Sequence, residues 1–268
     1  MSALAHIQPG GDEYLEFCGG VAALTGIDLT QYKRGQMERR VRSFAEVRGA
    51  PDLPGYLAML VADPAQLERF LDRMTINVSQ LWRNPGQFAL LAETVIPELA
   101  ASGRVRCWSA GCSYGAEAYT LAAICAEAAP DARIEIHGTD IDARMVERAR
   151  AGRFSAADVR SAPPEQLDRW FRPAADGCWE AAPALRMMVR FATGDLLADR
   201  FPSGAYDLVL CRNVVIYFTE DVRDRLHARL AGALRVGGYL MTGSSERISS
   251  PTAAGLEPTA PFIYRRAV

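Results

Sequence analysis

The pattern of hydrophobic and polar positions divides the chain into a helical first part and a mixed second part. Apolar residues recur at helical spacing over 12–24 and 32–47, and shorter helices are expected over 56–60 and 65–74. Pro51 and Pro54 are expected to end the second helix. Since no strand pattern occurs in this region, we predict an all-helical domain over residues 1–75.

Beyond residue 101 the pattern changes to short β-rich runs that alternate with helix-forming runs. Strands are expected at 105–108, 134–139, 188–193, 206–211, 238–242 and 262–265, and helices over 116–129, 143–151 and 221–234. Such alternation predicts an α/β domain, over residues 101–268, with a parallel sheet covered on both faces. The alternation lapses at about 154–187. A linker and helix over 76–100, with Asn84 as the expected N-cap and Pro85 at the first helical position, join the two domains.

Polar or small residues follow four of the predicted strands. A turn containing Gly111 follows the first strand and leads directly into a helix, and the other strands end near Asp140, Asp195 and Asn213. Ligands of open α/β sheets bind at the carboxyl ends of the strands, where glycine lets the backbone approach them. A turn with two glycines is equally compatible with plain sheet architecture, so the turn alone does not establish a cofactor site.

The strand ends favour one kind of nucleoside ligand. The glycine turn lacks the full GxGxxG pattern, and Asp140 lies beyond the spacing typical of dinucleotide enzymes, which disfavours NAD. Asp140 is placed to accept from ribose hydroxyls, and Asp195 with Leu196 suits the amino group and ring face of an adenine. The turn also carries no Lys or Arg to clamp phosphates. These features fit S-adenosylmethionine (SAM).

Composition excludes several classes of protein. The chain has 268 residues, a net charge of −2 and ordinary hydrophobic content, so nothing in its overall charge attracts nucleic acid or an anionic membrane. Its six cysteines form no CxxC pair, which indicates reduced thiols and no metal site. No long apolar run and no export signal is present. We therefore expect a cytoplasmic protein without membrane insertion.

A basic helix is the main feature of the first domain. Only Glu38 and Glu46 oppose its bases locally; these bases are Lys33, Arg34, Arg39, Arg40, Arg42 and Arg48. Two interpretations remain open, a solvated helix face and a docking surface for an acidic partner. DNA is a poor partner because no aromatic residues interleave these arginines.

Several motifs together resemble one family. The run WSAGCSYGAEAY at 108–119 resembles the cofactor motif of the chemotaxis receptor methyltransferases, the CheR family. The resemblance covers nearly the whole chain and extends to NVSQLWR at 77–83, TDID at 139–142, the highly specific CRNVVIYF at 211–218, and TGSSE at 242–246.

The resemblance implies a class I SAM-dependent methyltransferase fold with a helical N-terminal domain and a small β subdomain inserted at about 154–187. It implies methyl transfer from SAM to glutamate carboxylates of the helical cytoplasmic bundle of chemoreceptors, giving methyl esters and S-adenosylhomocysteine (SAH). Arg83 and Tyr217 would flank the transfer. The expected cofactor residues are Asn77, Ser79, Arg83, Gly111, Glu117, Asp140, Asp195, Leu196, Cys211, Arg212 and Asn213, and the expected docking residues are Arg34, Arg39, Arg40 and Arg42.

The chain departs from the family pattern at a few positions. The family usually has Glu-Glu-Pro at 116–118, where this chain keeps only Glu117, and it usually has Asn in place of Asp195 and Thr in place of Ser79. Family members that bind a receptor C-terminal pentapeptide carry a glycine-rich turn in the β subdomain, where this chain has Gly177 alone. We therefore expect that the protein needs no such tether. We also expect a monomer.

The chemistry of this transfer needs no base. A glutamate carboxyl, with an unperturbed pKa of roughly 4.3, is already a nucleophile at neutral pH. This agrees with a chain in which none of the three histidines is placed as a base. Two alternatives stay open: a class I methyltransferase of small molecules, and a SAM- or SAH-binding signalling module that has lost turnover.

Overall fold

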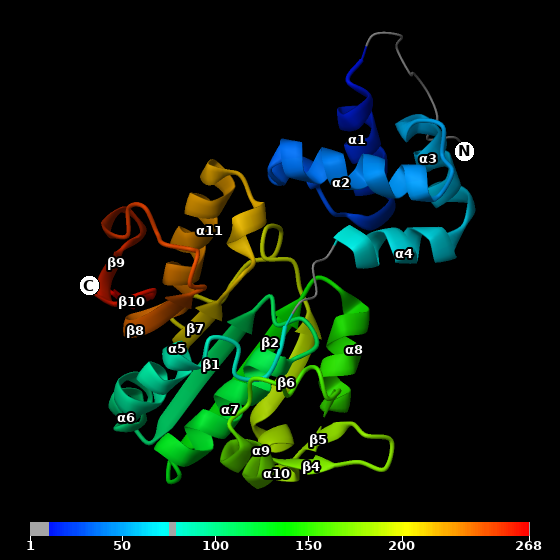
Figure 1. The fold of residues 1–268 in the computed structure, drawn as a ribbon. Coiled ribbons are helices and arrows are strands. Elements are labelled where there is room, and N and C mark those ends of the chain that lie inside the picture. Colours follow the sequence, from blue (N-terminus) through cyan, green and yellow to red (C-terminus); the bar gives the residue numbers. More distant parts are fainter. Residues whose placement is uncertain (1–10, 75–78, 268) are drawn as a thin grey trace. The chain divides into compact units, whose positions relative to one another are not determined.

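The structure, a computed structural model, describes residues 11–74 and 79–267. The chain divides into two compact units (Figure 1). The first comprises Met1–Ile76 and Tyr217–Val222, and the second comprises Asn77–Ile216 and Arg223–Val268. The boundary between the units is therefore not a single position in the sequence, because a short stretch from the second half of the chain belongs to the helical unit.

Helices make up the described part of the first unit. They are α1 (Glu13–Thr25), a 3-10 turn (Leu29–Gln31), α2 (Arg34–Val47), α3 (Leu53–Ala62) and α4 (Pro64–Met74). In its core the rings of Phe17 and Tyr56 stack, and the ring of Phe70 meets both edge to face. Pro54, expected to end a helix, instead lies in the first turn of α3, where a missing N–H costs nothing and Asp52 caps the helix.

The stretch Tyr217–Val222 is bound to this unit by backbone and ring contacts. The Lys33 N–H donates to the Tyr217 carbonyl at 2.8 Å, and the Thr219 N–H donates to the Gln31 carbonyl at 3.1 Å. The rings of Tyr32 and Phe218 meet edge to face with centroids 5.0 Å apart. The backbone of Tyr217 is thus held by the residues that lead into α2.

A seven-stranded sheet forms the centre of the second unit. Its order is β6-β2-β1-β7-β8-β10-β9, and it is parallel except for the two antiparallel pairings that β10 makes. The strands are β1 (Arg104–Ala110), β2 (Arg133–Asp140), β6 (Val189–Thr193), β7 (Tyr206–Cys211), β8 (Leu234–Thr242), β9 (Leu256–Ala260) and β10 (Ile263–Arg266). The mostly parallel sheet is confirmed. Strand β9 was not predicted, because Pro258 interrupts its pattern, and it lies at the sheet edge, where proline is tolerated.

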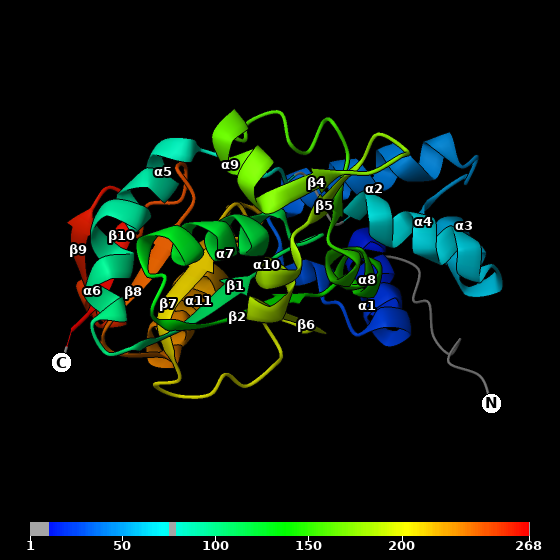
Figure 2. The same ribbon diagram turned by 90° about the horizontal axis from the view of Figure 1, so that it is seen from below.

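Helices cover both faces of the sheet. Figure 2 shows α7 (Ala116–Ala128), α5 (Pro85–Leu90) and α6 (Ile96–Ala100) on one face, and α11 (Glu220–Ala233) on the other. α8 (Ala143–Ala151) follows β2. A π-helical turn, Leu91–Val95, joins α5 to α6 just before Pro97, whose missing N–H disturbs the helical bonding pattern.

The insert is a small antiparallel sheet with two short helices. Its strands are β3 (Arg153–Phe154), β4 (Phe171–Pro173) and β5 (Trp179–Ala181), in the order β3-β5-β4, and its helices are α9 (Pro164–Trp170) and α10 (Pro183–Met188). The turn between β4 and β5 is closed by a bond from the Ala174 N–H to the Cys178 carbonyl, with Gly177 at φ +78°. The predicted β subdomain is therefore present. Across the described ranges, no helix has the length and apolarity needed to cross a membrane.

Candidate functional site

The glycine turn lies where the order of the sheet reverses. β1 pairs with β2 on one side and with β7 on the other, so the carboxyl end of β1 is a topological switch point. Gly111 has φ +77°, and a Cβ there would come within 2.5 Å of Val214 Cγ2. Gly115, at φ +85°, precedes α7, and a Cβ there would come within 2.9 Å of Ala149 Cβ. Both glycines are thus required by the packing of the turn itself.

Asp140 ends β2 and binds this turn. Its Oδ2 accepts from the Ser113 N–H at 2.7 Å, and its Oδ1 accepts from the Asp142 N–H at 3.0 Å. The side chain is buried, and burial raises the pKa of its carboxyl above the usual range. Its carboxylate therefore lies directly beside the glycine turn, as the sequence predicts.

Glu117 and Arg212 form a buried ion pair at the same edge. Arg212 Nη1 lies 3.1 Å from Glu117 Oε2, and the exposed fractions of the two side chains are 2% and 11%. Glu117 Oε1 accepts from the Ser109 hydroxyl at 2.7 Å. The guanidinium also lies over the Phe88 ring, 4.9 Å from its centroid. Two residues that lie 95 positions apart in the sequence thus neutralise each other beside the turn.

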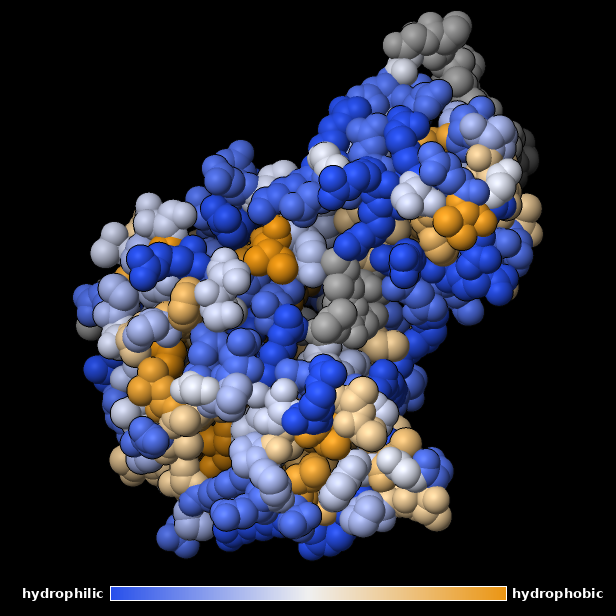
Figure 3. All heavy atoms as spheres, in the orientation of Figure 1, coloured by the Kyte–Doolittle hydropathy of each residue, from blue (hydrophilic) through white to orange (hydrophobic). Residues whose placement is uncertain are grey.

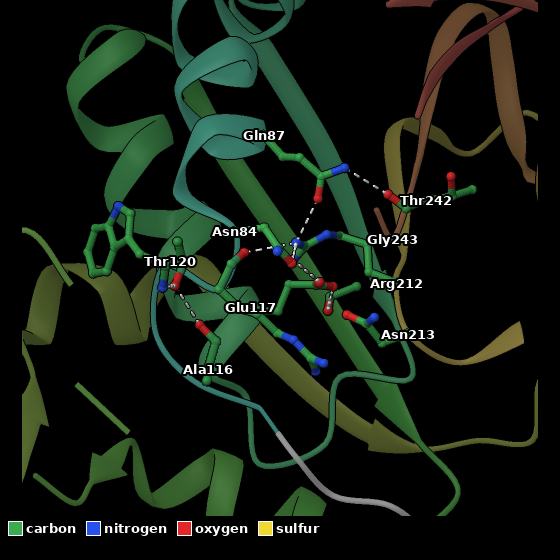
Figure 4. Close-up of polar contacts among 12 residues, drawn as sticks. Asn84, Gln87, Ala116, Glu117, Thr120, Arg212, Asn213, Thr242 and Gly243 are labelled. Atoms are coloured by element: carbon green, nitrogen blue, oxygen red, sulfur yellow. Dashed lines mark hydrogen bonds and ion pairs between the residues drawn. The ribbon is translucent and has the colours of Figure 1, made fainter. Parts of the chain in front are cut away.

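Arg212 also fastens the segment that links α5 to the preceding chain. Its Nη2 lies 2.8 Å from the Arg83 carbonyl, 3.0 Å from Asn84 Oδ1 and 2.9 Å from Gln87 Oε1. Figure 4 shows the Asn84 and Gln87 side chains beside Arg212. The predicted helix start is confirmed, because Asn84 occupies the N-cap position of α5 and Pro85 begins the helix, but the expected capping by the Asn84 side chain is not made. Asn84 has φ +60° and makes no capping bond, because its side-chain oxygen accepts from Arg212 instead.

The ends of β6 and β7 carry four further predicted cofactor residues, Asp195, Leu196, Cys211 and Asn213. Asp195 Oδ1 accepts from the Leu197 N–H at 2.7 Å, which closes a turn after β6, and Leu196 is buried. Cys211 ends β7 and is fully buried, and burial raises the pKa of its thiol well above the usual range. Asn213 follows with φ +61°.

Glu246 is a site residue to which sequence reasoning assigned no role. Its buried carboxylate accepts backbone N–H bonds from Asn213 at 2.5 Å, Gly243 at 2.8 Å and Ile216 at 3.3 Å. A Cβ at Gly243 would lie 2.4 Å from Glu246 Oε2, so only glycine fits there. Glu246 therefore holds the loop after β7. The TGSSE motif was the available signal, but it does not show what the glutamate binds.

The structure brings most predicted cofactor residues to one edge of the second unit. The turn with Gly111, Asp140, the Glu117–Arg212 pair and the Arg83 backbone are linked by hydrogen bonds, directly or through a neighbour. Asn77 lies outside the described residues. Tyr217 belongs to the first unit and Arg83 to the second, and each is placed only within its own unit.

The predicted docking arginines differ in their surroundings. Arg34 pairs with Asp12 and Glu38, and Arg42 pairs with Glu38 and Glu13. Glu38 thus opposes both arginines as the sequence indicates, and Asp12 and Glu13, at the start of α1, add partners that are distant in the sequence.

The other two docking arginines are also unlike each other. Arg40 is half-buried and donates to the Met74 carbonyl at 3.2 Å, whereas Arg39 is exposed. Arg39 borders a shallow hollow of about 420 Å³ on α2 together with Glu38, Arg42 and Glu46. Hydrophilic side chains gather over α1 and α2 (Figure 3). Arg39 is thus the predicted docking residue whose charge is most available.

Comparisons with known proteins agree with this architecture. The family model described as CheR methyltransferase, SAM binding domain, matches residues 77–259, and the model described as CheR methyltransferase, all-alpha domain, matches residues 12–75. A "Chemotaxis protein methyltransferase" of Listeria innocua is 34% identical over 254 residues, which cover 94% of this chain and 96% of the relative. A "Chemotaxis protein methyltransferase 1" of Pseudomonas aeruginosa is 33% identical, over 90% of this chain and 93% of the relative.

Among solved structures, the [4+2]-cyclase SpnF matches with a TM-score of 0.39 and 21% identity, over 64% of this chain and 58% of that one. The all-alpha model matches most of the first unit, and the SAM binding model covers β1, β2, β6, β7 and β8 of the second unit together with the glycine turn and the strand ends. SAM is the cofactor of such a domain. The chain therefore belongs to the CheR methyltransferase family and is a SAM-dependent methyltransferase.

Proposed function

We propose that this protein transfers methyl groups from SAM to glutamate side-chain carboxylates of chemoreceptors, as a protein-glutamate O-methyltransferase of chemosensory adaptation. Relatives named as chemotaxis protein methyltransferases align with it over most of both chains and support the pathway. The nature of the acceptor is inferred from the chemistry of the site.

The proposal is supported mainly by the state of the side chains at the sheet edge that could accept a proton: each is already protonated, paired or hydrogen-bonded. Burial keeps the thiols of Cys112 and Cys211 protonated by raising their pKa. Asp140 and Glu246 accept backbone N–H bonds, and Glu117 is paired with Arg212. An acceptor that arrives ionised, as a glutamate does, needs no base from the protein.

The described histidines are not placed to act as a base at this edge either. His137 lies in β2, where its Nδ1 is 3.2 Å from the Tyr206 hydroxyl. His227 is buried in α11. Neither of these described histidines lies at a strand end of the site. Among the described residues of this edge there is therefore no histidine and no ionised thiol to take a proton from an alcohol or amine acceptor.

The residues at the edge fit SAM. The cofactor supplies a methyl group activated by a sulfonium. A carboxylate has about four lone-pair positions, so Asp140 keeps capacity for ribose hydroxyls beyond its backbone bonds. Leu196 offers an apolar surface for the adenine and Asp195 an acceptor for its amino group. We assign the remaining cofactor contacts to Asn77, Ser79, Arg83, Gly111, Glu117, Cys211, Arg212 and Asn213.

Arg83 and Tyr217 would orient the reacting groups. Arg83 provides a positive charge for the acceptor carboxylate, and Tyr217 a hydroxyl that can donate to it. The methyl transfer is an in-line displacement, so holding the reacting atoms in position supplies much of the acceleration. We further propose that residues 1–75 dock the receptor through α2, that 76–100 form a linker and helix ahead of the methyltransferase domain over 101–268, and that no pentapeptide tether is required.

Transfer of a radioactive methyl group from SAM to a chemoreceptor cytoplasmic fragment tests the proposal. We expect label in the fragment that base treatment releases as methanol, as for a methyl ester. A matched fragment with its surface glutamates replaced by alanine should stay unlabelled. Base-stable label, or label in a small-molecule panel alone, would contradict the proposed acceptor. A protein that binds SAM but labels nothing would be a binding module.

A further inference from the structure

The segment 79–84 holds an unfavourable backbone conformation in front of α5. Trp82 has φ +51° and Asn84 has φ +60°, and neither is glycine. Side chains with a Cβ adopt this region only when the surroundings hold them there. The segment carries Ser79 and Arg83, so its conformation decides where two proposed cofactor residues lie.

Most of this segment is fastened by residues of the second unit. The Leu81 N–H donates to the Asp158 carbonyl at 2.9 Å, and the Trp82 N–H donates to the Thr120 hydroxyl at 3.0 Å. Arg212 holds the Arg83 carbonyl. These bonds fix the middle and the end of the segment, but none of them acts on Ser79.

Tyr114 holds the beginning of the segment. Its hydroxyl contacts the Ser79 carbonyl and lies 2.8 Å from Asp158 Oδ1. The Arg148 guanidinium lies over its ring, 3.9 Å from the centroid, and pairs with Asp158 Oδ2 at 2.8 Å. Tyr114 is 2% exposed, so its surroundings hold it from several sides. Tyr114 itself belongs to the glycine turn, between Gly111 and Gly115.

We propose that Tyr114, oriented by Asp158 and Arg148, is a positioning residue for SAM, whose hydroxyl holds the Ser79 backbone against the glycine turn. Through it, two proposed cofactor elements, the glycine turn and the Ser79 segment, share one anchor with α8, which follows Asp140 and carries Arg148. The inference rests on the proposed function, which places a cofactor contact at Ser79. Preorganising such a contact lowers the ordering cost that binding would otherwise carry.

The experiment compares two tyrosine-to-phenylalanine variants. Tyr119 is a matched control, because its buried hydroxyl also meets a backbone carbonyl, that of Ala149, at 3.2 Å, and its ring also packs near Phe154. Titration calorimetry with SAH should show a Kd about fivefold higher, or more, for Tyr114→Phe, as the loss of one hydrogen bond implies. Tyr119→Phe should stay within about twofold of the wild type by the same reasoning. The Tm of the ligand-free protein should fall by similar amounts in both variants.

A second variant tests the role of Asp158. Asp158→Asn keeps the backbone carbonyl that holds Leu81 but loses the charge that pairs with Arg148. Adding Tyr114→Phe to it should therefore raise the Kd less than Tyr114→Phe does in the wild type, because the two residues act as a unit. In methyl transfer, Tyr114→Phe should raise the KM for SAM by a larger factor than it lowers kcat.

Two results would overturn the inference. One is an unchanged Kd for SAH in Tyr114→Phe. The other is an equal rise in Kd in Tyr114→Phe and Tyr119→Phe, which would indicate a general loss of structure. A wild-type protein that binds SAH but leaves receptors unlabelled would instead contradict only the proposed acceptor, since this comparison needs no receptor.

Discussion

At the scale of single residues, the protein neutralises the charge at its cofactor edge. Glu117 and Arg212 are nearly excluded from water, and each has a further protein partner. A buried charge is costly unless it is paired and hydrogen-bonded. The pair therefore has a structural role in addition to any role in ligand binding, because it links α7 to the end of β7.

Replacing Glu117 with Gln should destabilise the protein strongly. Arg212 would remain buried without its anion, and removal of one partner from a buried pair costs about 3–5 kcal/mol of unfolding free energy. Urea denaturation followed by tryptophan fluorescence measures this, because Trp82, Trp108, Trp170 and Trp179 all lie in the second unit. Glu127→Gln, on the same helix, is the control: its side chain is 25% exposed and pairs with Arg169, so we expect a loss below about 1 kcal/mol. Equal losses in the two variants would contradict this interpretation of the buried pair.

Tyr217→Phe tests the proposed role of the tyrosine hydroxyl in the transfer step. Because a donor used only in the transition state affects kcat more than ground-state binding, we expect a fall in turnover of about tenfold or more. Affinity for SAM, measured by calorimetry, should stay nearly unchanged. If turnover and affinity fall by the same factor, the hydroxyl serves binding and the catalytic assignment is wrong.

At the scale of elements, α2 is less basic than its sequence indicates. Asp12 and Glu13, which precede and begin α1, pair with Arg34 and Arg42. Arg39 has no ion-pair partner in the described part of the chain and is exposed. Any electrostatic attraction of an acidic receptor surface therefore depends more on Arg39 than on the two paired arginines.

Reversing the charge at Arg39 should weaken receptor methylation without affecting SAM binding. We expect Arg39→Glu to raise the KM for a receptor fragment by about three- to tenfold at low salt, with the difference shrinking as salt screens the charges. Arg69→Glu, at an exposed arginine of α4, is the matched control and should change the KM little. If both variants behave alike, net charge matters and α2 has no special role.

At the scale of the whole molecule, one buried histidine links stability to pH. Burial lowers the pKa of His227 to about 4, and neither of its ring nitrogens has a hydrogen-bond partner among the described residues. As the pH falls, His227 takes up a proton in the unfolded chain, where its pKa is near 6.5, while it stays neutral in the folded protein. Stability should therefore fall as the pH drops from about 6.5 to about 4.

His227→Gln should remove this part of the acid sensitivity. At pH 5 the histidine lies about 1.5 pH units below its unfolded pKa, so it should cost the wild type about 2 kcal/mol relative to pH 7.5. The variant should lose that much less over the same interval, in urea denaturation followed by tryptophan fluorescence. Because each protein is compared with itself, any fixed cost of the substitution cancels. Identical pH dependence in the two proteins would show that His227 does not carry the effect.

Sequence alone identified much of the fold where signals are local. The prediction of a helix over 143–151 is confirmed, because Asp142 caps α8 at one end and Gly152 ends it in the left-handed region. The sequence did not identify β9, whose strand pattern is interrupted by Pro258. It also did not identify the partner of the Asn84 side chain, which is Arg212. Both depend on neighbours that are distant in sequence.

By itself, the sequence determined the alternation of strands and helices, the strand-end residues and the motifs of the family, because periodicity and turn chemistry act between near neighbours. Only the tertiary structure decided the strand order, the burial of Arg212 against Glu117, the clamp that Glu246 forms and the pairing of Asp12 and Glu13 with α2. These features join residues that are distant in the sequence and meet only through packing, so no pattern among neighbouring residues predicts them.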